Sequence, residues 1–161
     1  MPVDFIREIF KVMCECDWHI FMILTKRPHL MKRFVDEWVK ENGMLPEHIW
    51  LGTSIGLKKY WARVNWLKKV QCYIRFLSVE PQLGSMGRMN LSGIAMMIVG
   101  GESGDGHRLF KKKWGLQDLR ECRRQNVSFF FKQDGDRFPG RRENLLGKIY
   151  HEYPIDLDLW R

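Results

Sequence analysis

Residues 20–40 read IFMILTKRPHLMKRFVDEWVK, and they contain the unit that repeats along the chain. Five apolar residues are followed by Thr-Lys-Arg-Pro, and then by a segment with helical apolar spacing. A short run that is apolar on both faces is typical of a strand in a parallel sheet covered by helices. Proline fits the first turn of a helix. The stretch therefore predicts a strand over residues 20–24 and a helix over residues 29–40.

The same order recurs further along the sequence. Four more apolar runs predict strands, at residues 49–51, 72–79, 94–99 and 127–131. Three more segments have helical spacing, at residues 5–13, 57–70 and 114–124. Strands that alternate with helices predict an α/β fold with a parallel sheet. The pattern leaves two forms open, a doubly wound open sheet and part of a closed (β/α) barrel.

Two details bear on that choice. The link between Pro81 and Gly93 has room for little more than one helical turn, so we expect a loop or a short helix there. No Gly-x-Gly-x-x-Gly fingerprint follows an early strand, which disfavours a dinucleotide-binding version of the open sheet.

Polar residues and glycines gather directly after the five apolar runs. In a parallel sheet these carboxyl ends open on one side, where α/β proteins bind their ligands. The sequence therefore predicts a site there for a phosphate-bearing or other anionic ligand. The candidate ligand-binding residues are Thr25, Lys26, Arg27, Thr53, Ser54, Ser78, Glu80, Gly100, Gly101, Glu102, Ser103, Arg108, Lys132 and Gln133.

The glycine-rich segment 100–104 has two interpretations. Paired glycines let the backbone approach a ligand and leave N–H groups free. Glu102 would then accept hydrogen bonds from an amino group or a ribose hydroxyl, and Arg108 would clamp a carboxylate or phosphate. The alternative is a tight turn capped by Ser103, with Glu102 solvated.

Lys26 and Arg27 are adjacent, so a regular strand cannot point both side chains into one mouth. We expect one of them to face the ligand. The other is expected to pair with Glu80 or Glu102, and a purely structural ion pair between strand ends is the alternative.

The composition limits the partners. Among 161 residues the formal net charge is +8, which allows a nucleotide or nucleic-acid partner, although a merely basic soluble surface is the alternative. No stretch approaches the roughly 20 apolar residues of a membrane span, and the N-terminus does not resemble a secretory signal. We therefore expect a cytoplasmic protein that does not bind membranes.

The cysteines and histidines do not predict a metal site. Of four cysteines only Cys14 and Cys16 are close in sequence, and one such pair is a poor zinc site. The five histidines have no ligand-like spacing. Free thiols in a reducing compartment are the favoured interpretation.

Five ordered motifs carry a family resemblance, at residues 23–28, 49–54, 75–81, 98–104 and 129–133. Together they resemble the phage Gp-thirty-seven/Gp-sixty-eight family, a group of unknown function, over nearly the whole chain up to about residue 147. That family is in turn similar to radical S-adenosylmethionine (SAM) enzymes, which include the DNA-repair lyase of bacterial spores.

The resemblance implies a partial (β/α) TIM-type barrel of about five parallel strands over residues 1–147, with residues 148–161 as a C-terminal tail. Full-length relatives are expected to use a 4Fe-4S cluster and SAM on a nucleotide or nucleic acid. Their cluster segment and first two strands lie upstream of the matched motifs. Cys14 and Cys16 do not match the cluster motif, so no cofactor is expected in this chain.

The missing neighbour has a consequence for residues 20–24. They become an exposed apolar edge, which predicts self-association or aggregation. The chain also departs from its relatives at the presumed mouth, with Gly56 where many have Glu, and Asp134-Gly135 in place of Trp-Gly.

Three hypotheses for function follow. The chain belongs to a radical SAM-like enzyme, or it is a non-catalytic remnant that binds an anion or nucleotide, or it is a truncated product without activity. The sequence leaves open whether the protein is an enzyme, and it identifies no catalytic residue.

Overall fold

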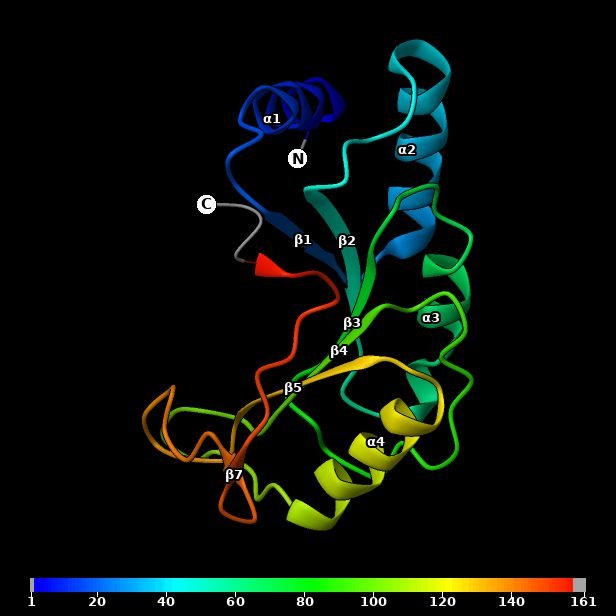
Figure 1. The fold of residues 1–161 in the computed structure, drawn as a ribbon. Coiled ribbons are helices and arrows are strands. Elements are labelled where there is room, and N and C mark those ends of the chain that lie inside the picture. The colour runs from blue at the N-terminus through cyan, green and yellow to red at the C-terminus, as the bar shows by residue number, and fades with distance from the viewer. Residues whose placement is uncertain (1, 158–161) are drawn as a thin grey trace.

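The computed structural model describes residues 2–157, in which helices and strands alternate (Figure 1). The strands of the main sheet are β1 (Phe21–Thr25), β2 (Ile49–Ser54), β3 (Arg75–Val79), β4 (Met96–Gly100) and β5 (Ser128–Gln133). The helices are α1 (Val3–Glu15), α2 (Pro28–Asn42), η1 (Lys58–Tyr60), α3 (Ala62–Leu67) and α4 (Lys112–Arg124).

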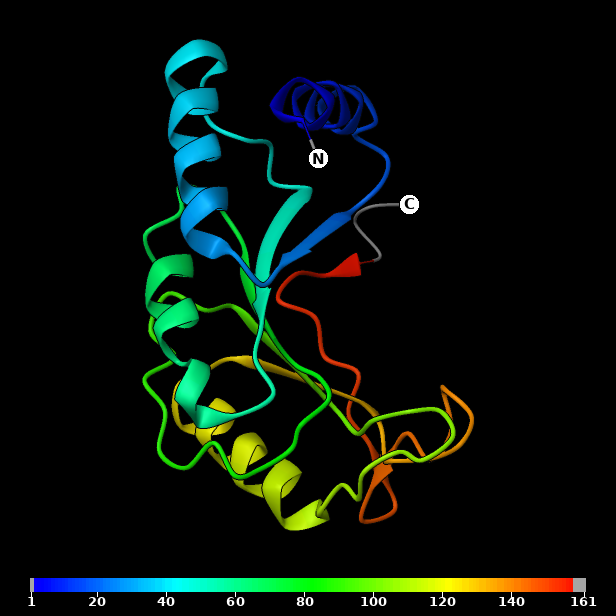
Figure 2. The ribbon, with the colours of Figure 1, turned by 180° about the vertical axis from the view of Figure 1, so that it is seen from behind.

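All neighbouring strands of the main sheet are parallel, in the order β1-β2-β3-β4-β5. Because every crossover steps in the same direction, α2, α3 and α4 lie on one face of the sheet (Figure 2). A doubly wound sheet would instead reverse its order and carry helices on both faces. Within the described residues β1 and β5 do not meet. The α/β prediction is therefore confirmed for a sequentially ordered parallel sheet, which is open and not closed into a barrel within residues 2–157.

In the N-terminal half of the chain, α1 and α2 pack together in the core on the helix face of the sheet. Pro28 occupies the first turn of α2, as predicted, and Gly43 ends the helix with φ of 83°. Between these ends Trp38 is buried, and the ring of Phe10 from α1 lies 5.6 Å from it. The buried ring of Phe10 thus fixes α1 against α2.

The segment predicted as one helix over residues 57–70 forms η1 and the shorter α3 instead. Lys58, the first residue of η1, and Lys68, the C-cap of α3, donate hydrogen bonds to the carbonyls of Arg88 and Asn90 at 2.6 and 2.7 Å. The segment is therefore tied to the loop between β3 and β4.

That loop, residues 80–95, contains no helix, in agreement with the short link expected from the sequence. Met86 and Leu91 are fully buried and cover the sheet where a crossover helix would lie. Side chains of α4 and of its C-cap residue accept hydrogen bonds from backbone N–H groups of this loop. The N–H of Met89 donates to Glu121 at 3.1 Å, and that of Leu91 to Gln125 at 2.8 Å.

On the opposite face of the sheet, the part next to β5 is covered by the C-terminal tail rather than by a helix (Figures 1 and 2). After a small hairpin of β6 (Asn144–Leu145) and β7 (Lys148–Ile149), the chain forms an antiparallel bridge between His151 and Phe130 of β5. Their rings stack with centroids 4.3 Å apart. The tail predicted over residues 148–161 thus begins inside a hairpin and packs on the sheet; its residues 158–161 lie outside the described residues.

The other edge of the sheet is bare. Among the described residues β1 pairs with β2 alone, and the side chains of Met22 and Leu24 are 39% and 49% exposed. The apolar pattern alone predicted burial on both faces, which is absent because the tail does not cover these side chains; the exposed apolar edge expected from the family resemblance agrees with these exposures. Across residues 2–157 no helix is both long and apolar enough to cross a membrane.

Candidate functional site

A pocket of about 280 Å³ lies at the carboxyl ends of β3, β4 and β5. Its position is where a parallel sheet gathers polar residues for binding. Every lining residue except Pro81 belongs to the predicted set. The lining residues are Glu80, Pro81, Gly101, Glu102, Ser103, Lys132 and Gln133.

Lys132 and Glu80 form the charged pair of the pocket. Nζ of Lys132 lies 3.3 Å from Oε1 of Glu80, and the Ser78 hydroxyl donates to the other carboxylate oxygen at 3.2 Å. The pairing of β4 with β5 shifts register after Val99, which leaves Lys132 as the extra residue of a bulge. The predicted partner of Glu80, either Lys26 or Arg27, is therefore wrong. Lys132 takes that place from the bulge in β5, although β1 and β5 are equally two strands away from β3.

Glu102 is held by Arg108 rather than left free for a ligand. Nε and Nη2 of Arg108 lie 2.7 and 2.6 Å from the Glu102 carboxylate, and the Arg108 backbone N–H donates to it at 2.9 Å. These hydrogen bonds lower the pKa of Glu102 to about 2. Arg108 clamps a carboxylate as predicted, but the carboxylate belongs to the protein. The residue therefore fixes the loop after β4.

The paired glycines serve packing rather than ligand approach. A Cβ on Gly100 would lie 2.8 Å from Oε1 of Glu80, and one on Gly101 would overlap the backbone of Gly135. The N–H of Gly101 is not free, because it donates to the Gln133 carbonyl at 2.9 Å. The Gln133 side chain donates back to the Gly101 carbonyl at 3.2 Å. Of the N–H groups that the ligand-approach interpretation would leave free, that of Gly101 is therefore engaged, since β4 and β5 continue their pairing through it.

The loops after β4 and β5 form one wall of the mouth. Ser103 bridges to Asp136, and the Asp136 N–H donates to the Glu102 carbonyl at 3.3 Å. Arg137 pairs with Asp105 across the same two loops at 2.7 Å. These contacts hold the Ser103 backbone at the rim of the pocket.

The predicted residues of β1 and β2 do not line this pocket. The Thr53 hydroxyl is buried and donates to the Thr25 carbonyl at 2.8 Å, so it ties the two strands together. The Thr25 hydroxyl accepts from the N–H of Arg27 at 3.0 Å at the start of α2. The Ser54 carbonyl accepts from Arg63 at 3.0 Å. Lys26 and Arg27 extend into solvent.

One family model matches residues 1–154, nearly the whole chain, and its members are described as proteins of unknown function. The chain belongs to the DUF5131 family. No curated protein and no solved structure matches it.

Beneath the pocket this DUF5131 chain buries a polar pair that the sequence interpretation missed. Asp118 of α4 and Gln82 after β3 are 0% and 1% exposed. Nε2 of Gln82 donates to Asp118 Oδ2 at 2.8 Å, and Gln82 Oε1 and Asp118 Oδ1 have no hydrogen-bond partner among residues 2–157. Burial raises the pKa of Asp118 to about 7, since it disfavours the charged form. A proton on Asp118 would supply the donor that the two oxygens lack.

A signal for this pair exists in the sequence. Asp118 stands four residues after Trp114 and four before Cys122, so helical spacing places it on the face assigned to the core. An acid between two inward-facing residues indicates a buried carboxyl group. Gln82, in an irregular loop, has no comparable signal.

The donors of a metal or cluster site are not present together in this DUF5131 chain. The described residues contain no group of three His, Cys, Asp or Glu side chains that would hold a metal ion. All four cysteines are free, with Cys14 and Cys16 half-buried at the end of α1 and Cys72 and Cys122 buried elsewhere. Burial raises the pKa of Cys72 to about 11, which disfavours the thiolate that a metal needs. The residues present therefore do not fit an iron–sulfur cluster.

Proposed function

We propose that this chain binds a nucleotide, free or within a nucleic acid, in the pocket at the ends of β3, β4 and β5. The observation that carries the proposal is the convergence of Glu80, Ser103 and Lys132 from three neighbouring strand ends on one pocket. They supply a carboxylate, a hydroxyl and an ammonium group, which match the hydroxyls and the phosphate of a nucleotide.

The charged pair indicates which part of the ligand each side chain would contact. Lys132 retains N–H donors beyond its contact with Glu80, and its side chain is 54% exposed, so it can bind a phosphate. The Ser103 hydroxyl has no hydrogen-bond partner within the described residues and adds a second donor. Glu80 accepts from Ser78 and Lys132, and its remaining lone pairs suit ribose hydroxyls. The net charge of +8 favours the approach of an anion.

The fold adds support through its topology. We interpret the open sheet as part of a TIM-type barrel, because its order is sequential and its helices lie on one face. The sequence resemblance to radical SAM enzymes agrees with a nucleotide-like ligand. For longer relatives we propose a radical SAM-like reaction on a nucleotide or nucleic acid. For this chain we propose binding without a radical step, since its cysteines do not fit the cluster, in a reducing compartment such as the cytoplasm.

The test measures three probes by isothermal titration calorimetry at low salt: adenosine 5′-monophosphate, ribose 5-phosphate and inorganic phosphate. We expect Lys132→Ala to weaken all three at least tenfold, because it removes the phosphate contact. Glu80→Gln is expected to weaken the two ribose-bearing probes and to leave inorganic phosphate unchanged or tighter. Affinity for each probe should fall as salt rises, through screening of the phosphate contact.

Lys113→Ala is the matched control, because Lys113 is an exposed lysine of α4 outside the pocket lining. It removes the same charge and should leave each affinity within twofold. The proposal fails if the wild-type chain binds none of the probes at millimolar concentration. It fails equally if Lys132→Ala and Lys113→Ala have the same effect, which would indicate nonspecific attraction to a basic surface.

A further inference from the structure

The bare edge of the sheet exposes backbone hydrogen-bonding groups. The N–H of Phe21 donates to the His48 carbonyl at 2.8 Å, so the backbone of Phe21 faces β2. Because bonding residues alternate along a strand, the N–H and C=O groups of Met22 and Leu24 point away from β2. No other strand pairs with them among residues 2–157.

This edge lacks the features that normally prevent association. Proteins protect edge strands with charges, prolines, bulges or a covering segment. The strand Phe21–Thr25 contains no charge and no proline, and its pairing with β2 has no register shift. Met22 and Leu24 are 39% and 49% exposed, and Trp18 just before the strand is 64% exposed. An apolar strip therefore accompanies the free backbone groups.

The charges around β1 indicate which partner fits. Glu15 and Asp17 precede the strand, and Lys26 and Arg27 follow it, all four exposed. None of them belongs to an ion pair within the part of the chain that the structure describes. A second copy of β1 in antiparallel orientation would bring the acidic end of one strand to the basic end of the other. A parallel copy would instead align like charges.

We propose that β1 is a homodimer interface, in which two copies pair antiparallel about a two-fold axis and join their sheets. The same strand then serves both sides, as a two-fold interface requires. Met22 and Leu24 supply the backbone bonds, and their side chains face those of the partner across the axis. The opposite end charges fix the antiparallel direction.

The test is sedimentation-velocity ultracentrifugation of the whole chain over a range of concentrations. Met22→Pro removes an outward N–H without touching the pairing with β2, and Leu24→Lys places a charge on the edge. Each change should weaken the dimer at least tenfold. Circular dichroism, and a thermal melt at a concentration at which every variant is monomeric, should match the wild type, because both side chains are half-exposed in the single chain.

Leu109→Lys is the control, since Leu109 is 76% exposed in the loop after β4 and lies away from β1. It should leave the dimer unchanged. A wild-type chain that stays monomeric at 100 μM would overturn the proposal. So would a dimer that survives both β1 variants while they remain folded, or one that Leu109→Lys dissociates equally, because each places the contact elsewhere.

Discussion

The two edges of the main sheet differ, because a returning segment covers β5 whereas β1 is exposed. After the hairpin of β6 and β7 the chain returns to β5, where His151 forms a bridge with Phe130 and stacks on its ring. The tail packs there on the face of the sheet that lies opposite the helices. Within the described part of the chain no returning segment covers β1, and Met22 and Leu24 stay half-exposed. The pocket formed beside the covered edge. The difference shows that polar residues at strand ends do not form a pocket by themselves. The connections that follow the strands must also fold over those ends.

The lengths of the connections explain this asymmetry. After β1, helix α2 begins at Pro28, so Lys26 and Arg27 have no loop to carry them back across the mouth. After β4, about ten residues precede α4, and they include Glu102, Ser103 and Arg108. After β5 a loop of similar length, residues 134–143, packs against the first and adds Asp136. The polar residues converge only where such loops exist.

The sharpest test of the comparison is a matched pair of truncations. Phe131→Ala in β5 should lower the free energy of unfolding by about 3–5 kcal/mol, because a fully buried ring is lost. Leu24→Ala in β1 should cost below about 1 kcal/mol, since half of its side chain is already in water. Urea denaturation of both variants, at a protein concentration low enough to keep the chain monomeric, measures the contrast. Equal losses would show that another segment of the same chain covers the β1 edge.

A second test concerns the buried acid under the covered half. Asp118 has a folded pKa of about 7, above its usual 3.8, so the folded chain binds the extra proton between those pH values. The contribution of protonated Asp118 to the free energy of unfolding is fully present below pH 4 and is lost as the pH rises through 7. The full cost of ionisation is about 4 kcal/mol, at roughly 1.4 kcal/mol per pKa unit.

Asp118→Asn replaces the acid with a neutral amide that does not titrate. The variant should equal the wild type near pH 4 and exceed it by up to about 4 kcal/mol near pH 9. Denaturation at several pH values gives the curve. Asp105→Asn, at an exposed loop position, is the control and should show no such divergence. A constant difference at all pH values would mean that Asp118 is ionised throughout.

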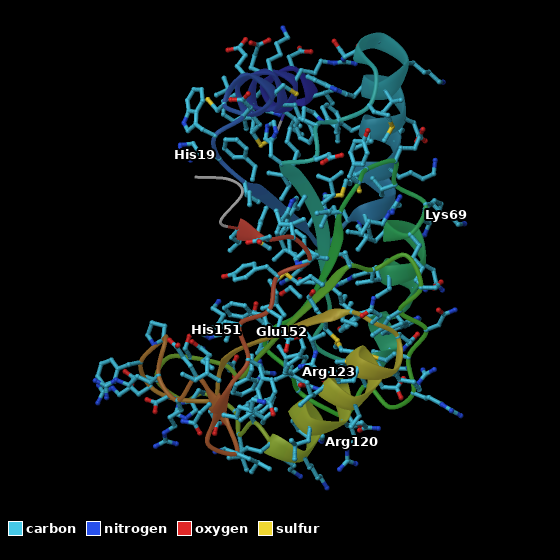
Figure 3. All side chains as sticks on the ribbon, in the orientation of Figure 1. His19, Lys69, Arg120, Arg123, His151 and Glu152 are labelled. Atoms are coloured by element: carbon cyan, nitrogen blue, oxygen red, sulfur yellow. The ribbon has the colours of Figure 1, made fainter. Side chains whose placement is uncertain are left out.

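The attachment of the tail is the third point of comparison. Arg123 of α4 and Glu152 of the tail point toward each other in Figure 3 and form an ion pair. The Glu152 carboxylate also accepts the backbone N–H of buried Phe129 at 3.0 Å.

Glu152→Ala should lower the unfolding free energy by about 1–3 kcal/mol, because it leaves the backbone N–H of buried Phe129 without its acceptor. Arg123→Ala removes only the exposed member and should cost about 1 kcal/mol or less. Thermal melts of the two variants measure the order. A larger loss in Arg123→Ala would assign the stabilisation to the ion pair instead.

The smallest effect is expected at the bare end of the sheet. Lys26→Ala should change stability by less than about 0.5 kcal/mol, because its side chain extends into solvent without an ion pair among the described residues. Affinity for ribose 5-phosphate should also stay within twofold. A tenfold loss of affinity would bring β1 back into the site.

The sequence was sufficient for the features that depend on local pattern. Apolar runs and helical spacing located all five parallel strands, and the polar residues after them included nearly all of the pocket lining. What it left open depends on distant contacts. The partner of Glu80 is set by a bulge at Lys132, and the role of Arg108 is set by a turn that brings it back to Glu102. Neither can be read from spacing along the chain.

The loop between β3 and β4 has an effect on how the molecule opens. Its backbone depends on Glu121 and Gln125 of α4 and its C-cap for hydrogen bonds that a helix would supply internally. Displacing α4 would therefore strip two buried amides, those of Met89 and Leu91, of their acceptors. Segments about thirty residues apart in the chain must open together, so the irregular loop is as resistant to local fluctuation as the helix that holds it.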